Sequence, residues 1–185
     1  MNVPFERRKE DCLGKDDKSS IGSWDKPILA LCNKINSKKS LYTLSSCSGR
    51  IVLIKNLDKK QPGMFILRSH DKITFNQLKK ALENYDGKEN LIFKQEAGIL
   101  HICCKEVSDA EELLNKARTA GWKNSGIMSL SGRIVLELRS TEYISLPIYE
   151  KEILVDDKFL KILVKEANRK LERAWEKINK LEKLI

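Results

Sequence analysis

The stretch SGRIVL stands twice in this chain, at residues 48–53 and again at residues 131–136. Runs of apolar and β-branched residues, which are typical of β-strands, lie on both sides of each copy. Farther out, both copies are flanked by segments with the apolar spacing of helices. The order helix, strand, SGR turn, strand, strand, helix therefore occurs twice. We infer an internal duplication with a tight turn in each copy.

The duplication predicts one domain, residues 1–185, built of two repeated halves at about residues 25–88 and 89–185. Strands joined by short turns favour a largely antiparallel or mixed sheet. Helices before and after those strands would cover one face of it. The expected fold class is α+β, in a two-layer arrangement that ends in a long C-terminal helix.

Several helix ends are indicated by capping residues. Asp25 and Thr74 each precede a helical pattern as N-cap candidates, and Ser108 with Glu111 has the spacing of a capping box. Residues 1–24 are polar and are expected to form a loop or an exposed arm.

The last helix, from Asp156 onward, has two distinct faces. Its apolar stripe advances in alternating steps of four and three, through Leu160, Val164, Ala167, Leu171, Ala174, Ile178, Leu181 and Ile185. Its basic face carries Lys161, Lys165, Arg169, Lys170, Arg173, Lys177 and Lys180. The stripe either packs along the domain or joins a second subunit in an oligomer. The basic face is either solvated or in contact with RNA.

Composition points to a soluble protein with an excess of positive charge. The chain has 35 Lys and Arg against 26 Asp and Glu, a net charge of +9. Such an excess suits a polyanionic partner such as nucleic acid, or it serves solubility alone, and charge does not choose between the two. Because no apolar run is long enough to cross a membrane and the N-terminal residues hold no apolar signal core, we expect a cytoplasmic protein without membrane contact.

Familiar cofactor and metal motifs are missing from the sequence. None of the five cysteines forms a C-x-x-C pair, so neither a zinc site nor a disulfide framework is expected. No G-x-G-x-x-G follows a strand, which disfavours a Rossmann cofactor site.

The densest polar cluster is SSCSGR, residues 45–50, between two apolar strands. Its members are Ser45, Ser46, Cys47, Ser48, Gly49 and Arg50. Small residues let a ligand approach the backbone, amides beside the glycine bind anions, and the guanidinium can clamp a carboxylate or phosphate. An ordinary hairpin with a solvent-facing arginine is the alternative, but it needs fewer hydroxyls. The second turn has Leu130 in place of Cys47, which suggests that only the first copy kept its chemistry.

Two histidines and two tryptophans remain open between a structural and a functional role. His70 and His101 each follow or lie in an apolar strand run, where a single histidine is usually a structural residue. Trp24 and Trp122 stand beside glycine or serine and either stack on a base or pack in the core.

Taken together, these stretches resemble the tRNA wybutosine-synthesising protein 3 family in its archaeal form, over nearly the whole chain. The stretches that carry the resemblance are Asp17-x-Ser19-x-x-Gly22-x-x-Asp25, Ser45–Arg50, Ser69-His70, Phe93-Lys94, Leu100-His101, Ala120–Ile127, Arg139-Ser140-Thr141 and Ala167-Asn168. One such motif would be weak, whereas this many in order is specific.

The resemblance implies transfer of a methyl group from S-adenosyl-L-methionine to a ring nitrogen, N4, of the tricyclic wybutosine precursor. That base lies beside the anticodon of phenylalanine tRNA, which would be the partner. Candidate bases for removing the nitrogen proton are Asp17, Asp25, His70 and His101. Candidate cofactor or substrate contacts are Asp17, Ser19, Ser45, Ser46, Cys47, Ser48, Gly49, Arg50, Trp122, Asn124, Ser125, Arg139 and Ser140.

Two other functional classes stay open on the residues alone. A non-catalytic RNA-binding module would use the SGR turns only to grip the RNA backbone. A structural adaptor would act through the last helix. Binding of S-adenosyl-L-methionine separates an enzyme from either.

Overall fold

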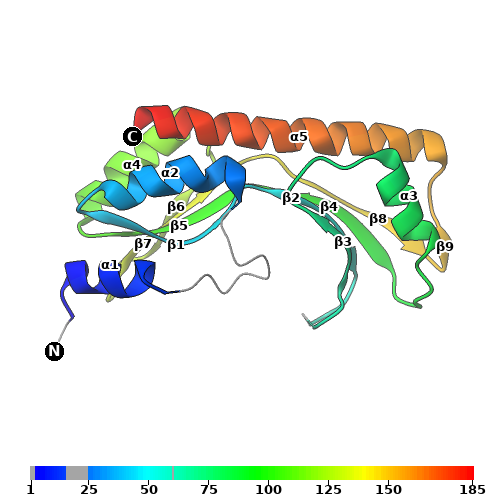
Figure 1. The fold of residues 1–185 in the computed structure, drawn as a ribbon, viewed down its shortest axis with the longest axis horizontal. Coiled ribbons are helices and arrows are strands. Elements are labelled where there is room, and N and C mark those ends of the chain that lie inside the picture. The colour runs from blue at the N-terminus through cyan, green and yellow to red at the C-terminus, as the bar shows by residue number, and fades with distance from the viewer. Residues whose placement is uncertain (1–2, 16–24, 60) are drawn as a thin grey trace. The chain divides into compact units, whose positions relative to one another are not determined.

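A computed structural model describes residues 3–15, 25–59 and 61–185 (Figure 1). The helices are α1 (Phe5–Leu13), α2 (Lys26–Ser37), α3 (Phe75–Glu83), α4 (Val107–Thr119) and α5 (Asp157–Leu184). The strands are β1 (Leu41–Cys47), β2 (Arg50–Lys55), β3 (Phe65–Ser69), β4 (Leu91–Glu96), β5 (Ile99–Cys104), β6 (Gly126–Ser129), β7 (Ile134–Arg139), β8 (Ile144–Glu150) and β9 (Glu152–Ile153).

The chain divides into two compact units whose segments alternate along the sequence. Unit 1 consists of residues 1–48, 98–141 and 174–185, and unit 2 of residues 49–97 and 142–173. Unit 1 holds the sheet β1-β5-β7-β6, and unit 2 holds the sheet β3-β2-β4-β8-β9. All strand pairs of both sheets are antiparallel, which confirms the predicted α+β class.

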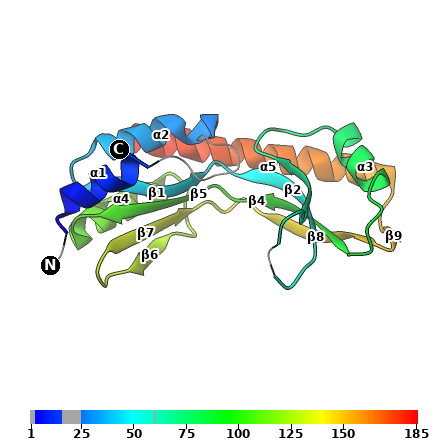
Figure 2. The ribbon, with the colours of Figure 1, turned by 60° about the horizontal axis from the view of Figure 1, so that its bottom comes forward.

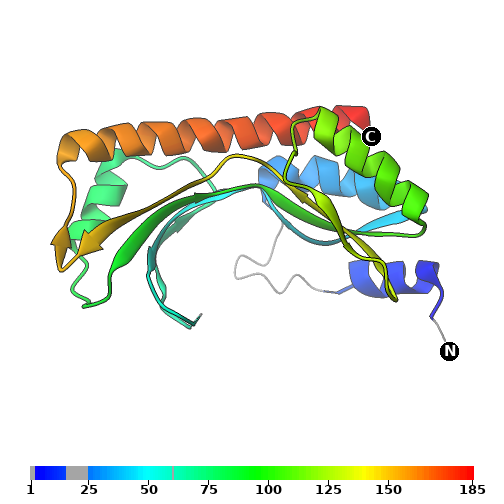
Figure 3. The same ribbon diagram turned by 180° about the vertical axis from the view of Figure 1, so that it is seen from behind.

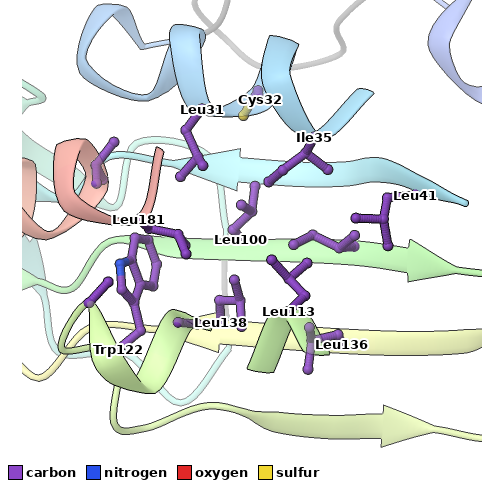
Figure 4. Close-up of a cluster of buried hydrophobic side chains, with 14 of the residues drawn as sticks. Leu31, Cys32, Ile35, Leu41, Leu100, Leu113, Trp122, Leu136, Leu138 and Leu181 are labelled. Atoms are coloured by element: carbon purple, nitrogen blue, oxygen red, sulfur yellow. The ribbon is translucent and has the colours of Figure 1, made fainter. Parts of the chain in front are cut away.

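In unit 1, helices α2 and α4 and the end of α5 cover one face of the sheet (Figures 3 and 4). Alternate residues of β5, Leu100, Ile102 and Cys104, point to this face, as the period of a strand requires. Trp122 is fully buried in the same core, and its indole N–H donates to the carbonyl of Lys177 at 3.1 Å. This core is the main apolar cluster of unit 1.

Helix α1 packs on the opposite face, which we call the outer face of the unit 1 sheet. Tyr42 and Cys103, which alternate with the core residues, form a small cluster there with Phe5. The rings of Phe5 and Tyr42 have centroids 5.2 Å apart. The prediction of a loop at residues 1–24 is therefore wrong for 5–13, because a run of charged side chains concealed a helix that needs only a few apolar contacts.

In unit 2, α3 and the first part of α5 cover one face of the sheet (Figure 1). The predicted N-cap at Thr74 is confirmed, since its side chain accepts from the Gln77 amide and the Gln77 side chain accepts from the Thr74 amide. The Asn168 side chain of α5 bonds both the amide and the carbonyl of Ile73, at 3.0 and 2.8 Å. That pair of bonds fixes the start of α3 against α5.

The apolar stripe of α5 is buried from Leu160 to Leu181, in unit 2 for its first part and in unit 1 for its last. Its buried members pack inside the chain's own cores. No helix in the described ranges is long and apolar enough to span a membrane.

The two SGR turns differ in the structure. β6 and β7 pair with each other, so residues 131–133 form the predicted hairpin turn (Figure 2). β1 and β2 belong to different sheets, so Ser48 and Gly49 form a crossing from unit 1 to unit 2 instead of a hairpin. The element order α2–β1–β2–β3–α3 does return as α4–β6–β7–β8–α5. The duplication into halves itself stays a prediction.

The capping box expected in α4 is displaced toward the N-terminus. Glu106 is the N-cap, and its partner is Asp109, in place of the predicted Ser108 and Glu111. The pattern of residues placed the cap correctly to within about one turn, because acidic residues at both positions satisfy the first amides of a helix equally well.

Candidate functional site

The side chains of the SSCSGR cluster point in two directions. Ser45 pairs in register with His101 and Cys47 with Ile99, which places both on the outer face of the unit 1 sheet. Ser46 pairs with Leu100 and hydrogen-bonds the Cys32 side chain of α2, on the core side. The cluster is therefore not one continuous polar surface.

Ser48, also on the α2 side, is held by a carboxylate. The Oδ2 atom of Asp25 accepts from the backbone N–H of Ser48 at 2.8 Å and from its hydroxyl at 3.1 Å. Asp25 occupies the predicted N-cap position of α2, but its side chain does not cap the helix. Because Ser48 is fully buried, these two bonds satisfy donors that water cannot reach.

The thiol beneath this turn is chemically quiet. Burial raises the pKa of Cys32 to about 11, the hydrogen bond from Ser46 lowers it, and the negative charge of Asp25 raises it again. A thiol with so high a pKa is protonated at neutral pH, and it serves as a small apolar residue.

A row of three hydrogen-bonded side chains crosses the outer face of the unit 1 sheet. Ser45 Oγ lies 2.8 Å from Nδ1 of His101, and Nε2 of His101 lies 2.9 Å from Oε2 of Glu137. The three residues stand on the adjacent strands β1, β5 and β7, in register with one another. Ser45 is exposed, whereas His101 and Glu137 are half-buried.

This row depends on an irregularity in β1. The register shifts between Thr43 and Ser45, so that Leu44 is an extra residue in the strand. Strict alternation from Tyr42, which faces outward, would turn Ser45 toward α2. The bulge turns it outward onto His101 instead.

The partners define the protonation pattern of the row. A carboxylate only accepts hydrogen bonds, so with a neutral ring the proton is assigned to Nε2 of His101, facing Glu137. Nδ1 then accepts from the hydroxyl of Ser45. A hydroxyl, an imidazole and an orienting carboxylate in this order form a proton relay that opens at Ser45.

Arg50 lies on the unit 2 side of the crossing, at the start of β2. Its guanidinium pairs with the carboxylate of Glu96, the residue opposite it on β4. Gly49, immediately before it, is buried and has φ +99°, a left-handed conformation that a side chain would strain. The glycine therefore allows the sharp change of direction between the units.

Three residues of the second half have backbone partners. The hydroxyl of Ser140, which is buried, accepts from the amide of Gly98 at 3.2 Å. The hydroxyl of Ser125 donates to the carbonyl of Trp122 and accepts from the amide of Arg139. A fully buried indole has no face for a base, so we assign Trp122 to the core and not to the site.

The remaining predicted residues are scattered. Asn124 and Arg139 are exposed, and the side chain of Arg139 lies on the outer face opposite Ile99. His70 follows β3 in unit 2 and is half-buried. Asp17, Ser19 and Trp24 lie outside the described residues. Glu137, which sequence reasoning missed, carried no signal beyond its place in an alternating strand.

An α+β protein with two antiparallel sheets, and no parallel strand pair in its described ranges, differs from the Rossmann architecture. Its sequence matches the profile of the family Methyltransferase TYW3 over residues 7–185. The chain belongs to that family.

Relatives of known name and structure agree over almost the full length. A protein of Thermococcus sibiricus named tRNA(Phe) 7-((3-amino-3-carboxypropyl)-4-demethylwyosine(37)-N(4))-methyltransferase is 36% identical over 183 residues, 96% of this chain and 92% of the relative. A tRNA wybutosine-synthesizing protein 3 homolog of Danio rerio is 33% identical over 98% of this chain and 74% of its own. The solved structure of PH1069 from Pyrococcus horikoshii has TM-score 0.86 and 31% identity, with 98% and 96% of the two chains covered.

Proposed function

We propose that this chain methylates N4 of the 4-demethylwyosine-type base at position 37 of phenylalanine tRNA. One observation carries the proposal: similarity to the Thermococcus sibiricus enzyme of that name extends over 96% of this chain and 92% of the relative. The net charge of +9 suits a polyanionic substrate.

The proposed methyl donor is S-adenosyl-L-methionine, which when bound supplies a methyl group activated by a sulfonium centre. Its amino acid end carries one carboxylate and one ammonium group. The ion pair of Arg50 and Glu96, with side chains 29% and 31% exposed, presents the two complementary charges within reach of solvent. The donor chemistry of unit 2 therefore fits the amino acid end of this molecule.

The chain's own part in the reaction is to take the proton of the ring nitrogen. Methyl transfer breaks a carbon–sulfur bond and forms a carbon–nitrogen bond, and the nitrogen must lose one proton. In the proposed route Ser45 Oγ accepts that proton while its own proton passes to Nδ1 of His101. Glu137 holds the Nε2 proton and stabilises the resulting imidazolium.

Among the candidate bases, His101 is favoured because its two hydrogen bonds give the relay a direction. Asp25 is engaged twice by Ser48 and serves better as an anchor of the turn. The test of the function is a transfer assay with purified protein, labelled S-adenosyl-L-methionine and tRNA(Phe) that carries the 4-demethyl precursor.

Mass spectrometry of the digested tRNA should show one added methyl group on the precursor base. Unmodified tRNA(Phe) is the control and should gain none. Binding of tRNA without any transfer would instead favour the non-catalytic RNA-binding module. The cytoplasmic location expected from the sequence stays a prediction.

A further inference from the structure

We propose that the outer face of the unit 2 sheet, opposite α3 and α5, is a docking surface for the RNA of the substrate. The surface consists of Arg50, Phe65, Arg68 and Lys94, which we call the basic face. This inference rests on the proposed function for the identity of the RNA, but not for the existence of the surface.

Strand register places these residues on one side of the sheet. Val52 of β2 stands opposite Arg68 of β3 and Lys94 of β4. Their neighbours Leu53 and Phe93, one position along, are fully buried. Successive side chains alternate between faces, so Arg68 and Lys94 point away from α3 and α5, which cover the other face (Figure 1).

An aromatic ring holds two guanidinium groups on this face. The guanidinium carbons of Arg50 and Arg68 lie 5.3 and 5.4 Å from the centroid of the Phe65 ring. Contact with a ring restricts a long side chain and leaves the N–H edges of its guanidinium turned outward. Less conformational entropy is then lost when the arginines bind a partner.

The charges of the basic face are only partly neutralised. Arg50 pairs with Glu96, but within the ranges that the structure describes neither Arg68 nor Lys94 has a carboxylate partner. Other basic residues of unit 2 do have such partners. These pairs are Lys72 with Glu172, Lys79 with Asp157 and Arg169 with Glu166. The face therefore keeps a local positive charge.

Positive charge beside planar groups on an open sheet is the chemistry that suits single-stranded RNA. Lysine and arginine bind phosphates, and guanidinium planes stack on unpaired bases. The anticodon loop that holds base 37 is such a single strand. An acidic protein or an anionic membrane would use the charge of Arg68 and Lys94, but not the flat arrangement around Phe65.

The test compares two double variants with the same loss of charge in unit 2. One is Arg68→Gln with Lys94→Gln on the basic face. The other is Arg173→Gln with Lys165→Gln, two exposed residues of α5. The measurements are the Kd for precursor tRNA(Phe) at several salt concentrations, the KM and kcat of transfer, and the Tm.

We expect the basic-face variant to bind tRNA about tenfold more weakly at about 0.1 M salt. The slope of log K against log salt should fall by about 1 to 2, since each lost phosphate contact contributes about 0.9. The KM for tRNA should rise in parallel while kcat falls much less. The α5 variant should stay within about twofold of the unchanged protein, and both should keep its Tm.

Equal weakening in both variants, or stronger weakening in the α5 variant, would overturn the proposal. So would competition by anionic vesicles or an acidic peptide as strong as that of the tRNA. If the unchanged protein binds tRNA through the basic face but transfers no methyl group, the proposed function fails and the docking surface stands. If it transfers methyl groups and the basic-face variant behaves like it, only the docking surface fails.

Discussion

The carboxylate of Asp25 accepts two hydrogen bonds from Ser48, a residue 23 positions later in the chain. The bonds join the residue before α2 to the residue after β1. They hold the last residue of unit 1 just before the chain crosses into unit 2 at Gly49. A side chain that the sequence predicts as a helix cap thus anchors the SSCSGR cluster.

Removal of this anchor should destabilise the protein. Asp25→Ala leaves the buried amide and hydroxyl of Ser48 without their acceptor, which costs about 1 to 3 kcal/mol. Asp25→Asn keeps one acceptor oxygen and should lose less. Urea unfolding followed by circular dichroism measures both. An Asp25→Ala midpoint equal to that of the unchanged protein would contradict the anchoring role.

The relay predicts graded losses of rate along its three residues. His101→Asn should lower kcat by about 10²- to 10⁴-fold, because it removes the base. Glu137→Gln should lower kcat by roughly tenfold or more, and Glu137→Asp should restore part of it. The KM for tRNA should hardly change in any of them. Single-turnover transfer assays separate these effects.

The matched control for Glu137 is Glu111→Gln, a change of the same kind at an exposed position of α4. It should leave both kcat and stability unchanged. If His101→Asn retains more than half of the rate, proton transfer does not run through this row, and another candidate base has to be sought.

The two SGR arginines should not be equivalent. Arg50 is half-buried and paired with Glu96, whereas Arg133 is exposed in the β6–β7 hairpin. Arg50→Ala should raise the KM for S-adenosyl-L-methionine by roughly thirty- to a hundredfold, which corresponds to about 2 to 3 kcal/mol for a charge-assisted contact. Arg133→Ala should change it little. Equal damage from both would show that the second turn also serves catalysis.

The five cysteines should react with iodoacetamide in two groups. Burial raises the pKa of Cys32 to about 11 and that of Cys104 to about 12. Only the thiolate reacts, so at pH 8 at most about one in a thousand of either thiol is reactive, and both should be alkylated last. Cys12 and Cys47, which are half-buried, should be modified first. Peptide mass spectrometry over time measures the order, and all five should react in urea.

Local patterns in the sequence predicted much of the fold. The apolar spacing of α5, the cap at Thr74 and the strands around SGRIVL are all present, because each depends on residues close together in the chain. The pairing of β1 with β5 could not be predicted this way. It decides that Ser48 and Gly49 form a crossing and not a hairpin.

The candidate site was predictable in residue type but not in arrangement. The serines of the cluster and His101 stood out as polar residues in apolar strands. That Ser45 faces His101 depends on the bulge at Leu44, for which no glycine or other marker gives a signal. Glu137 joins them only through the neighbouring strand β7. Long-range register, rather than local propensity, assembles the row.

The alternation of segments between the units also affects the order in which the protein is made. Residues 174–185 belong to unit 1, yet the ribosome adds them after all of unit 2. Ile178 and Leu181 within them fill the core that α2 and β5 begin. During translation, the apolar surface of the N-terminal unit therefore stays open until the end of α5 emerges. A nascent chain paused before Ala174 is a substrate for chaperones, even though its unit 2 is complete.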